Sequence, residues 1–255
     1  MHHFFVEPSQ IRENRICVTG SDVNHIRNVL RIRPGEEVLV SDGLGTDYIC
    51  RTEELKEDRV ELQILEISEE GTELPAEIWL FQGLPKSDKM ELIIQKAVEL
   101  GAAGIVPVAT CNAVVKLDAK KAEAKTKRWQ TIAESAAKQS KRSRIPQVKL
   151  PVRMKEAFEM LEREGFTLRM IPYEREEGME GTRKVIGAVK PGEKIAVFIG
   201  PEGGFTGEEI RQAMDYQVQP ISLGKRILRT ETAGLSVLSL LMLKLEGAVD
   251  GMAGL

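Results

Sequence analysis

The chain has 255 residues, of which 42% are hydrophobic and 29% are charged, and its formal net charge is −3. This composition is typical of an ordinary soluble protein with one large or two modest domains, and the charge alone indicates no nucleic-acid partner. Three scattered cysteines, no signal peptide and no apolar run of the about 18–20 residues that span a membrane predict a cytoplasmic protein without disulfides, metal or membrane partner.

The first seventy residues read mostly as short strands around one helix. Apolar residues alternate or cluster over three short segments: 38–42, 46–54 and 59–67. Residues 21–31 are typical of a helix, because Val23, Ile26 and Leu30 fall on one face. Several short strands with one helix predict a small β-barrel-like module.

An acidic segment separates this module from the rest of the chain. Residues 53–77 hold ten acidic residues against two basic ones, and Gly71 and Pro75 lie near its end. A charge run of this kind is most often a solvated face. We place the predicted domain boundary at the end of this stretch, which gives domains 1–72 and 73–255.

After residue 77, strands and helices alternate. The expected strands are 77–84, 104–109, 167–173, 194–200 and 218–223. The expected helices are 87–100, 118–141, 154–164, 207–217 and 231–246. Thr206 and Glu209 have capping-box spacing at the start of one helix. The alternation predicts an α/β domain with a mostly parallel sheet covered on both faces, in which ligands bind at the carboxyl ends of the strands.

A glycine-rich loop, IGPEGGFTGEE, follows the strand that ends near residue 200. Its glycines allow close approach of a ligand or positive φ, while Pro201 stiffens the loop and Glu202 puts a carboxylate at its tip. The loop is neither a P-loop nor a GxGxxG motif, so it predicts a ligand other than a triphosphate or a standard dinucleotide. The alternative is a tight turn that only leads into the helix capped by Thr206.

A second loop, ISLGKRILRTETA, follows the last strand. Ile227 and Leu228 lie between a strand and a helix, where apolar side chains can line a pocket for a flat ligand. Arg229 can orient an anionic or polar partner, and its alternative role is an ordinary surface arginine. Thr230 is a candidate N-cap of the helix that follows.

Positive charge is concentrated between Lys116 and Arg153, where twelve basic residues stand against three acidic ones. Such a cluster fits phosphate contacts that position a nucleic acid, and a solvated helix face is the alternative. Trp129 has helical spacing with Ile132 and Ala136, which favours a core position. The candidate RNA contacts are His25, Arg27, Arg31, Lys86, Lys89, Lys138, Arg142 and Arg144.

Four segments closely resemble the ribosomal RNA small-subunit methyltransferase E family: GLPKSDKMELIIQKAVELG, RWQTIAESAAKQSKRSRIPQV, IGPEGGFTGEE and LGKRILRTETA. The resemblance implies a SPOUT-type parallel sheet with a C-terminal trefoil knot, preceded by a small PUA-like β-barrel domain. It also implies a homodimer that uses S-adenosyl-L-methionine to methylate N3 of a uridine in 16S rRNA within the small ribosomal subunit.

The resemblance further implies that three segments hold the methyl donor. They are Ile171, Pro172 and Tyr173; then Gly200, Pro201, Glu202 and Gly203; then Leu223, Gly224, Ile227, Leu228 and Arg229. Backbone groups of these loops are expected to bind the adenine, with Ile227 and Leu228 against it. The chain departs from the family after residue 109, where Cys111-Asn112 replace a Glu-Arg pair, and Asn112 or Lys116 is the candidate substitute.

Catalysis is expected to involve Arg229 and Glu202. The N3 atom of uridine carries a proton, so Arg229 is expected to stabilise the developing anion, and Glu202 to accept the proton or orient the methyl donor. No histidine lies beyond residue 25 to take that role. Two alternatives remain open: a non-catalytic RNA-binding protein, and a methyltransferase for another RNA such as transfer RNA.

Overall fold

The structure is a computed structural model that describes residues 1–68, 71–176 and 178–247. Its first compact unit consists of Met1–Glu73 together with Ala137–Ile145. Its second unit consists of Leu74–Ala136 and the described residues from Pro146 onward. The division predicted at 72/73 assigns residues 137–145 to the second domain, whereas their contacts place them in the first unit. Ion pairs and hydrogen bonds to Asp22, Asp47 and Glu73 hold them there.

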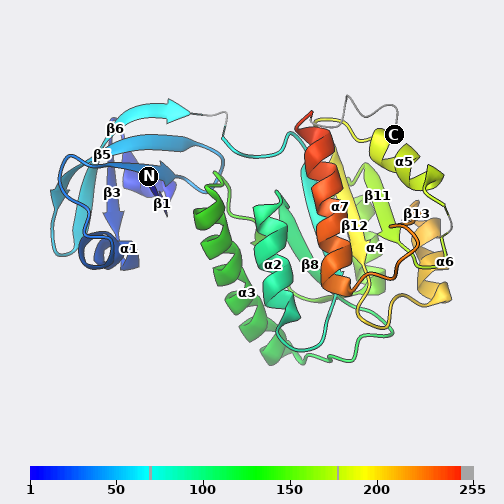
Figure 1. The fold of residues 1–255 in the computed structure, drawn as a ribbon. Coiled ribbons are helices and arrows are strands. Elements are labelled where there is room, and N and C mark those ends of the chain that lie inside the picture. Colours follow the sequence, from blue (N-terminus) through cyan, green and yellow to red (C-terminus); the bar gives the residue numbers. More distant parts are fainter. Residues whose placement is uncertain (69–70, 177, 248–255) are drawn as a thin grey trace. The chain divides into compact units, whose positions relative to one another are not determined.

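A six-stranded sheet in the order β1-β4-β5-β6-β3-β2 forms the first unit (Figure 1). Its strands are β1 (His2–Phe5), β2 (Ile11–Arg12), β3 (Arg15–Thr19), β4 (Glu37–Ser41), β5 (Asp47–Leu55) and β6 (Arg59–Ser68). Only β1 and β4 pair in parallel. Buried residues alternate along β3 and β4, which places their apolar faces in one core with Phe4 and Ile26.

The helix expected over 21–31 is shorter and less regular than its apolar spacing indicates. A 3₁₀ turn, η1 (Pro8–Gln10), comes earlier in the unit. The helix itself is α1 (Ser21–Asn24), which continues as the π-helical turn η2 (His25–Val29). It ends before Arg31, whose φ of 55° lies in the left-handed region that terminates helices.

The second unit is a parallel sheet in the order β10-β8-β7-β12-β11-β13, with β9 also paired to β8. Its strands are β7 (Glu77–Gly83), β8 (Gly104–Ala109), β9 (Gln147–Val148), β10 (Val152–Arg153), β11 (Leu168–Pro172), β12 (Lys194–Ile199) and β13 (Gln219–Ile221). All seven run parallel, which confirms the predicted α/β class. The central strands β7 and β12 are almost wholly buried because helices cover both faces of the sheet.

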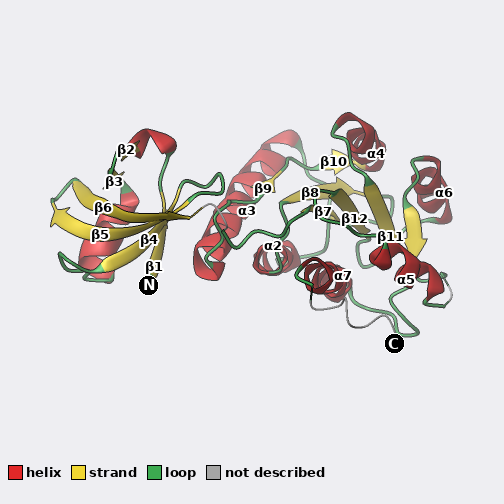
Figure 2. Cartoon of the chain, turned by 90° about the horizontal axis from the view of Figure 1, so that it is seen from above, coloured by secondary structure: helices red, strands yellow, loops and turns green. Residues whose placement is uncertain are grey.

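The helices of this unit form two layers around the sheet (Figure 2). They are α2 (Lys89–Glu99), α3 (Ala119–Ser140), α4 (Met154–Arg163), α5 (Glu180–Gly187), α6 (Gly207–Asp215) and α7 (Thr230–Leu245). Helices α2, α5 and α7 cover one face, and α4 and α6 cover the other. The sequence prediction missed α5, because its segment EGTRKVIG is polar and begins and ends near glycines.

Aromatic side chains fill the core between the sheet and α4. Phe81 and Phe198 stack with ring centroids 4.5 Å apart across neighbouring strands. Trp129 of α3 is only 3% exposed, which confirms its core position.

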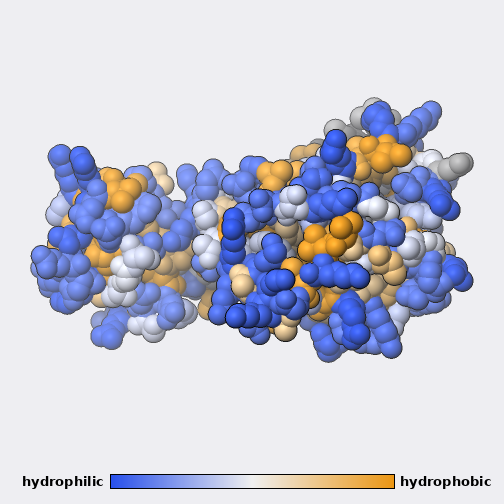
Figure 3. All heavy atoms as spheres, turned by 90° about the horizontal axis from the view of Figure 1, so that it is seen from below, coloured by the Kyte–Doolittle hydropathy of each residue, from blue (hydrophilic) through white to orange (hydrophobic). Residues whose placement is uncertain are grey.

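No helix among the described residues is long and apolar enough to cross a membrane. The face drawn in Figure 3 is mostly hydrophilic, with small hydrophobic patches among the charged side chains.

Candidate functional site

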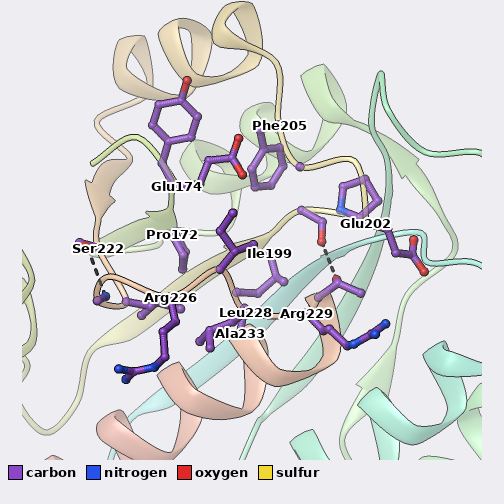
Figure 4. A pocket seen from close by; sticks show the side chains of 18 of the residues that line it. Pro172, Glu174, Ile199, Glu202, Phe205, Ser222, Arg226, Leu228, Arg229 and Ala233 are labelled. Atoms are coloured by element: carbon purple, nitrogen blue, oxygen red, sulfur yellow. Dashed lines mark hydrogen bonds between the residues drawn. The ribbon is translucent and has the colours of Figure 1, made fainter. Parts of the chain in front are cut away.

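A pocket of about 440 Å³ lies at the carboxyl ends of β11, β12 and β13, beside the first turn of α7 (Figure 4). Three chain segments supply most of its lining: 172–174, 199–205 without Gly203, and 222–230. These are the positions at which open α/β sheets bind their ligands. The volume falls within the about 300–1,000 Å³ that is usual for small-molecule sites.

The residues expected to hold a methyl donor line this pocket, except Ile171 and Gly203. Ile171 is fully buried in the core, and the Gly203 carbonyl is bonded to Asn112. The two apolar residues of the last loop differ, because Leu228 is half-buried whereas Ile227 is 85% exposed at the rim. The sequence prediction missed Glu174 and Phe205, whose side chains lie on the upper wall in Figure 4.

A short hydrogen-bond chain joins the glycine loop to the start of α7. The Thr230 hydroxyl donates to the Gly200 carbonyl at 2.5 Å and accepts from the Gln82 side-chain amide at 2.8 Å. Thr230 is therefore not the N-cap that its sequence position indicated; Arg229 holds that place, and its carbonyl accepts from Ala233 N. Gln82 is a lone amide in the apolar run EIWLFQGL, a signal that sequence reasoning missed.

The end of β7 approaches the glycine loop too closely for any side chain. A Cβ atom on Gly83 would lie 2.7 Å from both the backbone N and Cδ of Pro201. Such distances are essentially never observed, so Gly83 is required for this contact. The close approach lets Gln82 reach Thr230 and fixes the loop against the sheet.

Glu202 is held by partners from the β7–α2 connection. Its carboxylate accepts from the Lys86 backbone N–H at 3.1 Å and pairs with the Lys89 ammonium at 3.1 Å. Lys89 also pairs with Glu231 at 3.4 Å, so it is not the free RNA contact that we expected. Partial burial raises the pKa of Glu202, but hydrogen bonds from its own N–H, Lys89 and Lys86 outweigh it and hold that pKa below its usual range. An ionised carboxylate with these bonds is a weak base, so the geometry favours an orienting role over proton transfer.

The segment after β8 clamps the glycine loop from its other side. The Asn112 side-chain amide donates to the carbonyls of Gly203 at 2.9 Å and Gly204 at 3.2 Å. The Cys111 N–H donates at 2.9 Å to the carboxylate of Glu209, which is 3% exposed. Glu209 also accepts from Thr206, completing the capping box at the start of α6 that the sequence predicted. Asn112 thus shapes the loop beneath the pocket.

Arg229 is an exposed cation that lines the pocket. Its guanidinium extends to one side of Leu228 and Ala233 in Figure 4, toward the side on which Glu202 lies. Among the residues that the structure describes, its side chain forms no ion pair. The Arg229 guanidinium is therefore available to bind a substrate.

The described residues contain no group of three or more His, Cys, Asp or Glu side chains arranged to hold a metal.

The basic cluster of residues 138–144 is largely engaged inside the first unit. Arg142 is only 4% exposed and pairs with Glu73, so it is not available to RNA phosphates as we expected. Lys138 pairs with Asp22 at 3.1 Å, and the Arg144 guanidinium lies against Gly45. Four of the candidate RNA contacts are exposed: His25, Arg31, Lys86 and Arg144. Arg27 is half-buried.

Comparisons with known proteins assign both parts of the chain. An RNA methyltransferase domain matches residues 72–242, and an RNA methyltransferase PUA domain matches residues 18–65. Ribosomal RNA small subunit methyltransferase E of Bacillus subtilis is 34% identical over 253 residues, covering 96% of this chain and 98% of the relative. The enzyme of the same name from Mesomycoplasma hyopneumoniae is 34% identical over 94% of this chain and 98% of its own. The crystal structure of the Neisseria gonorrhoeae enzyme of that name, bound to S-adenosyl methionine, superposes with a TM-score of 0.80 at 30% identity and covers 99% and 98% of the two chains.

Proposed function

The chain belongs to the ribosomal RNA small subunit methyltransferase E family, and from this premise we propose that it transfers a methyl group from S-adenosylmethionine to N3 of a uridine in 16S rRNA. The observation that carries the proposal is the pocket formed where the segments after β11, β12 and β13 meet. Those segments contain the residues that the sequence assigned to the methyl donor. A relative of the same family carries S-adenosyl methionine in its crystal structure.

The lining of the pocket suits that compound chemically. Pro172, Ile199 and Leu228 offer apolar surface for a flat adenine ring, and the loop backbones offer N–H and C=O groups for its edges. The Glu174 carboxylate can accept hydrogen bonds from ribose hydroxyls. When bound, S-adenosylmethionine supplies an electrophilic methyl group on a positively charged sulfur. The Glu174 carboxylate in the lining complements that charge.

The protein's task in catalysis is to make N3 of uridine nucleophilic. In our proposal the Arg229 guanidinium donates to the carbonyl oxygens of the base, where negative charge accumulates as the N3 proton leaves for solvent. Glu202 keeps the glycine loop in shape through Lys86 and Lys89 rather than taking the proton. In-line placement of N3 and the methyl group then follows from the rigid loops.

The proposed reaction is tested by methyl transfer from labelled S-adenosylmethionine to 30S subunits, followed by nuclease digestion and mass spectrometry of the nucleosides. We expect labelled 3-methyluridine at one site of the 16S rRNA. Arg229→Ala should slow single-turnover transfer at least about a hundredfold if the guanidinium stabilises the transition state. When total transfer RNA is offered beside the 30S subunits, label in the transfer RNA alone would favour the alternative of a different RNA target, and label on another atom of the uridine would contradict N3 methylation.

We also propose that the second unit carries the trefoil knot of the SPOUT class. The segment 222–229 leaves the edge strand β13, yet the next residue, Thr230, bonds to Gly200 at the end of β12. The chain therefore crosses the carboxyl end of β11, which lies between these strands, and this crossing supports a threaded connection. A crystal structure in which the segment runs outside the loop after β11 would contradict the knot.

A homodimer in the cytoplasm is the proposed state of the enzyme. On α7, Leu240 and Leu243 are 40% and 39% exposed, and on the neighbouring α2, Leu92 is 45% exposed. Apolar residues gathered on adjacent helices are typical of subunit contacts. Light scattering at micromolar concentration should give twice the chain mass. The Leu240→Lys/Leu243→Lys variant should give a monomer, and a monomeric wild type would contradict the proposal.

A further inference from the structure

The loop between β13 and α7 exposes an unusual combination of side chains. Lys225, Arg226 and Arg229 are all exposed, and Ile227 among them is 85% exposed. No other large apolar side chain in the described part of the chain is as exposed as Ile227. Burying this isoleucine and neutralising its neighbours therefore requires a partner that is both anionic and partly apolar.

The cations of this loop are unpaired, unlike three of the residues expected to contact RNA. Lys89, Lys138 and Arg142 all form ion pairs with carboxylates of their own unit. Within the described residues, neither Lys225 nor Arg226 forms an ion pair. In Figure 4 the Arg226 guanidinium extends away from Ile199 and Phe205, on the opposite side of the pocket from Arg229.

The loop is anchored by hydrogen bonds at both ends, which restricts the positions that its side chains can adopt. Ser222 exchanges two hydrogen bonds with Thr182 of α5, at 2.8 and 3.0 Å, before the loop. Thr230 bonds to Gly200 after it. A segment anchored in this way loses less conformational entropy when it binds, which makes it a suitable recognition element.

We propose that residues 225–227 dock the single-stranded RNA around the target uridine, an inference that rests on the proposed function. Lys225 and Arg226 contact phosphates on either side of that nucleotide. When the uridine flips out of the base stack into the pocket, a neighbouring base loses its stacking partner, and Ile227 packs against that base. The role assigned to Ile227 thus shifts from the methyl donor to the RNA.

The test compares Lys225→Gln/Arg226→Gln, Ile227→Ala and the control Lys155→Gln/Arg163→Gln. Lys155 and Arg163 are exposed cations on α4, away from the pocket lining. Calorimetry gives the affinity for S-adenosylmethionine, filter binding gives RNA affinity against salt, and single-turnover assays on 30S subunits give the transfer rate. We expect all variants to bind S-adenosylmethionine within about twofold of wild type, because the changed loop side chains are exposed at the rim of the pocket, whereas the apolar surface of Pro172, Ile199 and Leu228 is unchanged.

For the loop double variant, the magnitude of the slope of log affinity against log salt should fall by about 1.4, the value for two lost phosphate contacts on single strands. Ile227→Ala should lower the transfer rate about tenfold, the change expected when most of the apolar contact between one isoleucine side chain and a base is lost. The proposal is overturned if the double variant keeps the salt slope of the control, or if either variant loses affinity for S-adenosylmethionine. A wild type that binds RNA through this loop but transfers no methyl group would instead overturn the proposed function alone.

Discussion

Replacing Asn112 by aspartate tests whether the clamp on the glycine loop supports methyl-donor binding. The wild-type amide donates to two carbonyls, those of Gly203 and Gly204. Aspartate has the same shape but no N–H groups, so its oxygens would face the two carbonyl oxygens. The loop is then expected to leave the conformation in which it lines the pocket.

The size of the effect follows from the two lost bonds. Each contributes about 0.5–1.5 kcal/mol net, and because Asn112 is exposed we take the lower half, about 1–2 kcal/mol in total. If the pocket-lining conformation becomes less populated by that free energy, the dissociation constant of the methyl donor rises about 5–30-fold. The free energy of unfolding should change less, because the loop is a small part of the unit.

Titration calorimetry with S-adenosylmethionine measures the effect directly. Asn112→Ala should fall between wild type and Asn112→Asp, because it loses the bonds without adding repulsion. Asn28→Asp is the matched control, since its amide bonds to Asn24 in the first unit, away from the glycine loop. Equal affinity of wild type and Asn112→Asp, within about twofold, would refute the role of the clamp.

Three further predictions concern the loop and the first unit. Gly83→Ala should abolish binding of the methyl donor and lower the free energy of unfolding by about 1–3 kcal/mol, measured by calorimetry and urea denaturation, because its Cβ would overlap Pro201. The pKa of Glu202 in the folded protein lies below its usual range. Its ionised carboxylate therefore stabilises the glycine loop fully above that range, and this stabilisation is lost as the pH falls through the folded pKa. The affinity of the wild type for the methyl donor should stay level down to about pH 5 and then decline. Glu202→Gln should bind the methyl donor more weakly, and its affinity should not decline at low pH. If the variant shows the same decline at low pH as the wild type, Glu202 is not the group responsible. Arg142→Gln should destabilise the protein by about 3 kcal/mol in urea denaturation, because it leaves Glu73 without its buried partner, and a stable variant with weakened RNA binding would restore the original phosphate-contact interpretation.

Elements with strong local signals were predictable from the sequence. Continuous apolar runs at β7 and β12 indicated buried parallel strands, and the spacing of Thr206 and Glu209 indicated the start of α6. The glycine loop and the segment ending at Arg229 were also placed correctly at strand ends, where they meet in one pocket. Each of these signals lies within a few neighbouring residues.

Features that depend on distant partners were not predictable. Arg142 appeared to be a free cation because Glu73, its partner, lies 69 positions away. Glu202 appeared available for proton transfer because Lys86 lies 116 positions away. Thr230 had the local pattern of a cap, but its hydroxyl bonds to Gly200 across the sheet edge. Helix α5 escaped notice because its short, polar segment has only two large apolar residues, Val185 and Ile186, although it packs against α7 and β13.

A crystal structure of the protein with S-adenosylmethionine tests the central claim most directly. We expect the compound in the pocket between Pro172, Gly200 and Leu228, with its methyl group toward the side on which Arg229 lies. Clear density for the compound at any other place, or a pocket that stays empty at a saturating concentration, would contradict it.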